Sequence, residues 1–229
     1  MTANVQIIHQ PDLFSDGQAG YHVRAIDPRE THPFILDVHY AHRLPAISYA
    51  FGLIRDGELV GIVTYGKPAS HTLCQGVCGI EWSSQVLELN RLCLLDNQTN
   101  EASRLVGASL RLLPKPTVVV SYADTAQDHL GVIYQATNFI YTGTTTARDE
   151  WYVEGDEQNH SRQLFHLASN TELGGLAGLR EMFGERLKTR PRSVKHRYIY
   201  FVAGRTDRKH LLEALRYPIQ PYPKRGSDA

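Results

Sequence analysis

The sequence predicts an α/β protein built on a mixed sheet, and three observations predict it. Two β-rich runs flank Asp56-Gly57, a strong short-range signal for an antiparallel hairpin. Residues 117–120 read TVVV, a β-branched run typical of a buried strand. Strand and helix patterns then alternate between residues 85 and 154, as they do in α/β domains.

Each element has its own local signals. Residues 35–45 predict a short helix that runs into a loop stopping at Pro45, and residues 67–79 predict a loop rich in small residues. Pro114 and Pro116 end the helical pattern of 103–113. Residues 1–30 and 156–190 show no clear pattern. The remaining predicted elements are strands at 47–55, 58–66, 85–96, 117–124, 143–154 and 196–204, and helices at 126–141 and from 206 onward.

The composition is that of an ordinary globular protein. Apolar runs stay well short of the roughly 20 residues of a membrane span, and residues 1–17 lack the pattern of a signal peptide, so we expect a cytoplasmic protein with no membrane partner. Cys74 and Cys78, with His71 upstream, lack the usual spacing of a zinc site, and we interpret them as buried thiols.

Charge is segregated along the chain although the formal net charge is zero. From Arg186 to the end there are 12 Lys and Arg against 3 acidic residues, whereas the first 185 residues carry 12 against 21. We therefore expect a domain at 1–185 and a basic extension at 186–229 packed on it. A basic end of this kind indicates a polyanionic partner, or else a solvated tail.

The order of elements resembles the GNAT acyltransferase fold, whose mixed central sheet has two splayed strands flanked by helices. The acyl donor of that fold lies between those strands, with its pyrophosphate at the start of the next helix. In DHLGVIYQATNFIYTG, Tyr134 stands four positions before Asn138-Phe139, where the fold's motif has Gly-Phe. The stretch LLDNQTNEASRLVG departs from the fold, because it has a single late glycine where a Gly-rich turn is usual.

A longer string of motifs is similar to the Mom family of bacteriophage DNA adenine modification proteins. It comprises ELNRLCLLD, NEASRLVGASLRLLPKP, VVVSYADTAQDHLGVIYQATNFIYTG and KHRYIYF, within residues 36–224. The resemblance implies a GNAT-like transferase that alters the exocyclic amine of adenine in duplex DNA, adding a methylcarbamoyl or acetamido-type group that protects phage DNA from host restriction. It also implies acetyl-CoA or a related acyl donor.

Asp124, at the end of the TVVVSYAD strand, is the first candidate for catalysis. The exocyclic amine of adenine is a weak nucleophile because its lone pair is delocalised into the ring, so a positioned base or acceptor is needed. The alternative is that Asp124 only caps the following helix. Glu88 is the rival base, since many GNAT enzymes use an acid on that strand.

Two hydroxyl groups complete the predicted catalytic set. Tyr134 corresponds to the GNAT tyrosine that protonates a leaving thiolate or orients the donor, and its alternative is packing on the sheet. Ser121 and Tyr122 point to opposite faces of their strand, and we choose Ser121 for the cleft because Tyr122 is more easily packed.

Three residues are predicted to bind the donor. Arg91 and Arg104 could grip phosphates of the donor or of DNA, because a guanidinium forms paired hydrogen bonds with phosphate. Ser103 could bind an anion at the helix start or simply cap the helix. Strand alternation predicts Glu88 and Asn90 on one face and Arg91 on the other.

His39 and Tyr40, with His42 nearby, form another polar cluster. On a helix, His39 and His42 would share a face and could hold a metal with a third ligand from elsewhere. Making a methylcarbamoyl-type group from an acetyl donor demands more than acyl transfer, so iron is a chemically motivated cofactor. The alternative is a solvated pair at the edge of the core.

The predicted DNA-binding residues come from the basic end, where positive charge would neutralise phosphates. They are Arg190, Arg192, Lys195, His196 and Arg197. Chemistry on a paired base also requires the base to leave the stack, and aromatic side chains can hold it. The aromatic candidates are Tyr49, Tyr65 and Trp82, each of which could equally belong to the core.

Two rival functions stay open from the sequence. An ordinary GNAT N-acetyltransferase acting on a small amine or a protein fits the fold but leaves the basic end unexplained. A non-catalytic DNA-binding protein fits the absence of a Gly-rich turn.

Overall fold

The structure, a computed structural model, describes residues 20–156 and 161–224, which form two compact units. The first unit contains the described residues up to 123 together with 130–143 and 196–224, and the second contains 124–129 and those of 144–195. Residues 1–17, which we searched for a signal peptide, lie outside the described residues. None of the helices in the described ranges has the length and apolar character needed to cross a membrane.

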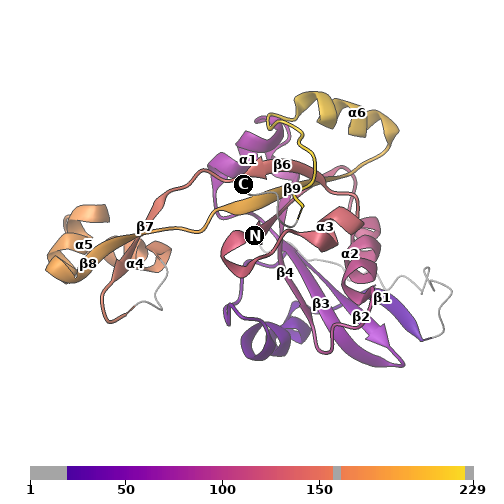
Figure 1. The fold of residues 1–229 in the computed structure, drawn as a ribbon, viewed down its shortest axis with the longest axis horizontal. Coiled ribbons are helices and arrows are strands. Elements are labelled where there is room, and N and C mark those ends of the chain that lie inside the picture. Colours follow the sequence, from indigo (N-terminus) through magenta and orange to yellow (C-terminus); the bar gives the residue numbers. More distant parts are fainter. Residues whose placement is uncertain (1–19, 157–160, 225–229) are drawn as a thin grey trace, which may run out of the picture. The chain divides into compact units, whose positions relative to one another are not determined.

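A seven-stranded sheet in the order β1-β2-β3-β4-β5-β9-β6 forms the centre of the first unit (Figure 1). Its strands are β1 (Tyr21–Ala25), β2 (Tyr49–Arg55), β3 (Glu58–Gly66), β4 (Val86–Leu94), β5 (Thr117–Asp124), β9 (Lys195–Val202) and β6 (Ile140–Thr144). Strands β1 to β4 pair antiparallel, whereas β4 and β5 are parallel. The expected mixed α/β architecture is confirmed.

Helices cover both faces of this sheet. On one face, α2 (Glu101–Leu112) and the short α3 (Val132–Ala136) pack on the largest core cluster, which includes Phe51, Leu105 and Val119. On the other face lie α1 (His71–Cys78), α6 (Arg205–Ala214) and the π-helix η2 (Phe34–Val38). The fully buried Ile35 and Leu211 anchor η2 and α6 to that face.

The hairpin prediction is confirmed, but two others are wrong. Residues 67–79 contain α1 rather than only a loop, because Ser70 caps its amino end and Cys74, Val77 and Cys78 are buried at helical spacing. The glycines near this segment concealed the pattern. The cysteines are free and buried, as expected.

The long helix predicted at 126–141 is also wrong, since only α3 and the 3-10 turn η4 (Thr125–Gln127) form there. Asp128 and Gly131 adopt left-handed backbone conformations, with φ of 52° and 70°, which interrupt a helix. Asn138, with φ of 61°, then leads directly into β6. The strand β1 lies in the stretch where the sequence showed no pattern.

The second unit is a small α/β module. Antiparallel strands β7 (Asp149–Val153) and β8 (Leu187–Pro191) pack with α4 (Ser161–Ala168) and α5 (Gly175–Phe183). Its core consists of Val153, Leu164, Ala168 and Leu179, all fully buried. The basic stretch that begins at Arg186 is therefore shared between the two units, with β8 in the second and α6 in the first.

Candidate active site

The centre of the candidate site is the point where β4 and β5 separate. The two strands pair over only three residues each, ending at Glu88 opposite Val120. Beyond that pair, Ser121 donates a hydrogen bond from its hydroxyl to the Leu89 carbonyl oxygen at 3.2 Å, across the widening gap. The predicted pair of splayed central strands is therefore present, and polar groups lie at the fork.

Tyr134 reaches this fork from α3. Its hydroxyl is hydrogen-bonded to Ser121, and its ring lies 5.3 Å from the rings of both Phe139 and Tyr198, measured between centroids. Burial raises the pKa of Tyr134, and the neighbouring Tyr40 and Glu88 raise it further against the effect of Ser121. Tyr134 is consequently a neutral phenol at physiological pH and can donate a proton.

Ser121 is a positioning group rather than an exposed nucleophile. Its side chain is fully buried, and its hydroxyl connects the Leu89 carbonyl to Tyr134. The sequence predicted Ser121 rather than Tyr122 for the cleft, and in the structure Ser121 lies at the fork while Tyr122 packs against the core cluster of the opposite face.

Arg91 shares a face with Glu88, and the alternation predicted from the sequence is wrong here. The register between β3 and β4 shifts so that Thr64 faces Arg91 and Tyr65 faces Leu89, which leaves Asn90 as the extra residue of a β-bulge. Asn90 accepts a hydrogen bond from the Thr64 hydroxyl at 2.6 Å and donates one to the Ala46 carbonyl at 2.9 Å. The bulge turns Arg91 toward the same side as Glu88.

The guanidinium of Arg91 is half-buried beside the fork. It donates to the carbonyl oxygens of Asn90 and Arg43, at 2.6 and 2.8 Å. Its buried Nε has no hydrogen-bond partner among the described residues. Burial and the nearby Arg43 lower the pKa of Arg91, but arginine stays a cation at physiological pH. Arg91 therefore brings a positive charge to a site that also contains Glu88.

His39 and Tyr40 lie next to Arg91, with their rings stacked at 4.4 Å. Burial lowers the pKa of His39 to about 4, and Arg91 and His42 add to the effect, so the imidazole is neutral. Its Nδ1 accepts the Ala41 amide at 3.0 Å, which places the ring proton on Nε2.

These groups do not fit the predicted metal site. A metal at Nε2 would need the other tautomer and the loss of the Ala41 hydrogen bond. Within residues 20–156 and 161–224, no three His, Cys, Asp or Glu side chains gather where they could hold a metal ion. We derive no step that uses iron.

The predicted donor-binding residues Ser103 and Arg104 lie at the start of α2. The first i to i−4 bond of this helix runs from the Arg104 amide to the Asn100 carbonyl, so the amides of Ala102 and Ser103 precede it and point out of the helix end. The Ser103 hydroxyl donates to the Asn100 carbonyl oxygen at 3.0 Å, a bond back to the preceding turn, whereas the N-cap residue of α2 is Asn100.

Asparagines replace the missing Gly-rich turn before α2. Asn97 and Asn100 have φ of 47° and 67°, the left-handed conformation that glycine adopts most readily and asparagine tolerates best among other residues. Asn138 does the same in the motif that follows Tyr134. Asn in place of Gly is the sequence signal that would have located this turn.

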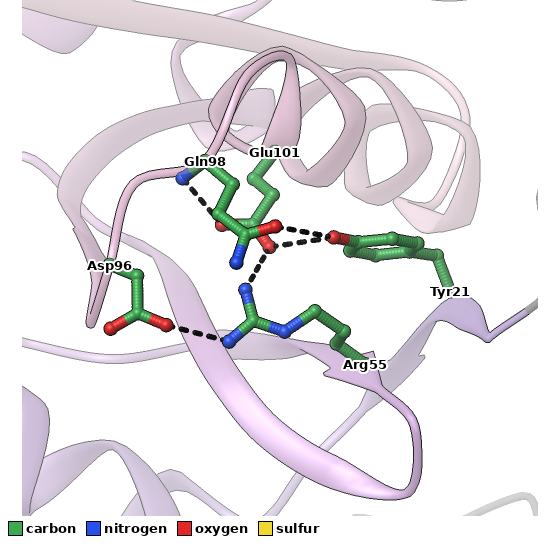
Figure 2. A network of polar contacts seen from close by, with 5 residues as sticks. All are labelled: Tyr21, Arg55, Asp96, Gln98 and Glu101. Atoms are coloured by element: carbon green, nitrogen blue, oxygen red, sulfur yellow. Dashed lines mark hydrogen bonds and ion pairs between the residues drawn. The ribbon is translucent and has the colours of Figure 1, made fainter.

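A buried carboxylate missed by the sequence reasoning organises the same turn. Glu101 is 2% exposed and accepts hydrogen bonds from Arg55 at 2.8 Å, from the Tyr21 hydroxyl at 3.1 Å and from the Gln98 amide at 2.9 Å. Figure 2 shows its carboxylate directed at Arg55, with Asp96 on the other side of that guanidinium at 2.6 Å. The pair of acids balances Arg55 and ties the turn to β1 and β2.

A shallow pocket of about 480 Å³ opens at this turn. Arg104 lies over the Tyr21 ring, 4.8 Å from its centroid, and lines the pocket together with Asn97, Gln98 and Thr99. The Arg104 guanidinium and these polar side chains fit an anionic group such as a donor phosphate. Glu101 also lines the pocket, and its charge is balanced by Arg55. Arg91 has other neighbours and is not part of this pocket.

Asp124 belongs to the second unit, where its carboxylate has several partners. It accepts the Ala126 amide at 3.0 Å as the cap of η4, and it forms an ion pair with Lys195 at 2.6 Å. Burial opposes ionisation, but hydrogen bonds from Lys195, Ser193 and the Ala126 amide together lower the pKa of Asp124. It is an ionised acceptor at physiological pH.

The predicted DNA-binding residues have diverse surroundings. Arg190 pairs with Glu150 at 2.9 Å, and Arg192 is exposed next to it. In the first unit, His196 contacts the Tyr141 hydroxyl at 2.9 Å, and Arg197 stacks on the Tyr217 ring at 3.4 Å while donating to Thr142. Of the aromatic candidates, Tyr65 is fully buried and hydrogen-bonded to Ser109, and Trp82 packs on the core. Tyr49 is 38% exposed.

Comparisons with known proteins agree with the resemblance seen in the sequence. The model of the Mom protein family matches residues 20–224. The methylcarbamoylase Mom of Escherichia phage Mu is 27% identical over 197 residues, which cover 81% of this chain and 76% of that protein.

Among solved structures, an N-acetyltransferase from Staphylococcus aureus Mu50 matches with 13% identity, covering 80% of this chain and 99% of that one at a TM-score of 0.43. NAA60 of Arabidopsis thaliana in complex with acetyl-CoA matches with 12% identity, over 80% and 99%, at a TM-score of 0.46.

Proposed function

Because this chain belongs to the Mom protein family, we propose that it is a transferase that modifies the exocyclic amine of adenine in double-stranded DNA. The added group is of the methylcarbamoyl or acetamido type, in line with the name of the phage Mu relative. The enzyme acts in the cytoplasm of the host cell and shields phage DNA from restriction. The observation that carries the proposal is that the family match includes all the polar groups gathered at the fork of β4 and β5.

The donor in this proposal is acetyl-CoA, or a related acyl thioester that already contains the nitrogen when the added group is a methylcarbamoyl. The outward amides at the start of α2, with Ser103 and Arg104, would hold its phosphates. When bound, such a donor supplies an activated carbonyl and a thiol leaving group.

Residues of this chain donate and accept the protons of the reaction and stabilise the charge that develops. Tyr134 keeps its proton because its pKa is raised, so its hydroxyl can donate to the leaving group. Glu88, one residue before the strands part, is an acceptor for the proton of the amine. Asp124 is the other candidate for this acceptor, because its lowered pKa keeps its carboxylate charged. Arg91 stabilises negative charge that develops beside Glu88.

Nucleoside analysis tests this function. Plasmid DNA from cells that make the protein is digested to nucleosides and examined by mass spectrometry. We expect a deoxyadenosine species with added mass, absent from cells with an empty vector. An unchanged profile with soluble protein present, together with acetyl transfer to a polyamine or peptide by the purified protein, would establish the N-acetyltransferase alternative instead.

A further inference from the structure

An exposed apolar segment runs from the middle of η2 to the first residue of β2. Residues 36–49, called the 36–49 segment below, place five large apolar side chains in solvent, although Phe34 and Ile35 just before them are buried. The five are Leu36, Val38, Tyr40, Leu44 and Tyr49, with Tyr40 at 66% and Val38 at 48% exposure. So many exposed apolar groups in 14 residues indicate a surface that meets a partner.

The segment is held in a fixed shape by its own hydrogen bonds. The His42 ring donates from Nδ1 to the Leu36 carbonyl oxygen at 2.6 Å, and the His42 amide donates to the His39 carbonyl at 3.0 Å. The Ala41 amide donates to the His39 ring. A fixed shape lowers the entropic cost of inserting this segment into a partner.

Anchors to the sheet place the segment at the fork. Arg91 and Asn90 of β4 donate to the carbonyl oxygens of Arg43 and Ala46, at 2.8 and 2.9 Å. The backbone passes so close to β3 that a Cβ on Gly66 would clash with the Ala46 carbonyl. Tyr40 is near enough to Tyr134 to influence its pKa. The segment is therefore fixed to β4, the strand that forms one side of the fork.

Positive charge accompanies the apolar groups. Arg43 is exposed next to Leu44, and Arg91 lies directly behind it. Cationic side chains beside the apolar groups of the 36–49 segment match the chemistry of a DNA duplex, in which stacked bases lie between two phosphate backbones.

We propose that the 36–49 segment enters the DNA duplex beside the target adenine and occupies the space left when that base turns out toward Tyr134. This inference rests on the proposed function. Extruding a base costs unstacking and unpairing energy, and apolar side chains inserted between base steps offset such a cost in other DNA-bending and base-flipping proteins. Val38 and Leu44 are the inserted groups, and Arg43 contacts the flanking phosphate.

The test uses the double variant Val38→Ser/Leu44→Ser and, as a matched control, Ile80→Ser, which removes a 68% exposed aliphatic side chain of the same unit. Duplexes are taken from sites found modified in plasmid DNA, with 2-aminopurine at the target adenine. Its fluorescence rises on unstacking, and anisotropy of a terminal label reports binding to the same duplex.

We expect the wild-type protein and Ile80→Ser to raise the 2-aminopurine fluorescence. The double variant should bind the duplex but extrude the base about tenfold less, with a similar fall in modified deoxyadenosine in cells. Full fluorescence gain and full modification by the double variant would overturn the inference. Light scattering provides a second way to overturn the inference. If the wild-type protein is a dimer and the double variant is a monomer, the 36–49 segment is covered by a second copy of the chain. Wild-type protein that yields no modified nucleoside would instead overturn the proposed function itself.

Discussion

At the residue scale, the candidate site depends on groups whose neighbours fix their protonation. Tyr134 is kept protonated by burial and nearby Glu88, whereas Asp124 is kept ionised by three hydrogen-bond donors. The sequence identified Tyr134 and Ser121 through a motif and strand alternation. It misplaced Arg91 because a bulge at Asn90 inverts that alternation, and bulges leave no simple mark in a single sequence.

Replacing Asp124 by Asn separates catalysis from capping. Asn caps helices about as well as Asp, so Asp124→Asn removes the negative charge and keeps the cap. If Asp124 holds the amine through its charge, modified deoxyadenosine should fall about a hundredfold. Quantitative mass spectrometry of plasmid nucleosides measures this, with Glu88→Gln compared in the same cells. Unchanged modification by Asp124→Asn would leave Asp124 with its structural role alone.

The same residue predicts a pH dependence of stability. A carboxylate with a lowered pKa stabilises the folded state above its ordinary pKa, and that contribution disappears as the pH falls through the lowered value. Asp124→Ala, which loses both cap and ion pair, should cost about 1–2 kcal/mol at pH 7, and the ion-pair part of that cost should disappear as the pH falls through the lowered pKa of Asp124.

Trp151 of the second unit reports this unfolding in a Trp82→Phe background, by fluorescence in urea. A cost that stays constant from pH 7 to pH 3 would contradict the assigned direction of the pKa shift. Asp149→Ala, at an exposed position of β7, is the control.

At the element scale, asparagines take the place of glycines in the turn before α2. Two left-handed asparagines take the conformations of a Gly-rich turn, and buried Glu101 ties that turn to Tyr21 and Arg55. An acidic residue in the first turn of a helix is common because it complements the helix dipole, so Glu101 attracted no attention in the sequence. Its burial is a tertiary property.

Two acids bound to Arg55 give a matched comparison. Glu101→Gln removes the buried member and leaves Arg55 with one partner, whereas Asp96→Asn removes a member that is 57% exposed. Breaking a buried pair costs far more than breaking a surface pair. Calorimetry should show a melting temperature lowered by roughly 5 °C or more for Glu101→Gln and by little for Asp96→Asn. Equal shifts would mean that Glu101 does not organise the turn.

The elements themselves were predictable where local signals agreed with tertiary packing. The hairpin at Asp56-Gly57 and the strand TVVV were predicted because a turn signal and a β-branched run specify them locally. Helix α1 was missed because its buried face is made of cysteines and a valine beside glycines, and α3 was overextended because Asp128 stops a pattern that otherwise reads as helical. A single sequence does not reveal a left-handed aspartate.

At the scale of the whole molecule, the basic residues that suggested DNA are shared between the two units and differ in their partners. Arg192 is exposed in the second unit, whereas Arg197 of the first is stacked on Tyr217 and bonded to Thr142. Counting charges along the chain suggested a polyanionic partner or a solvated tail, but it did not indicate which cations are exposed, because exposure depends on folding.

Salt dependence distinguishes these two arginines. If Arg192 contacts a phosphate, Arg192→Ala should reduce the slope of log K against log salt by about 0.9. Arg197→Ala should leave that slope unchanged and lower the melting temperature, since its guanidinium has internal partners. Fluorescence anisotropy on a duplex at several salt concentrations provides the slopes. If only Arg197→Ala altered the slope, Arg197 and not Arg192 would be the residue that contacts phosphate.

In the proposed function, Tyr134 at the fork of β4 and β5 takes part in modifying adenine in DNA. The most direct test is the amount of mass-shifted deoxyadenosine in plasmid DNA from cells that make the wild-type protein, Tyr134→Phe or the control Tyr200→Phe, whose ring packs on Phe139 in the same core. The proposal predicts abundant product for the wild type and Tyr200→Phe and about a hundredfold less for Tyr134→Phe at equal soluble protein. Equal amounts of product from Tyr134→Phe and the wild type would contradict it.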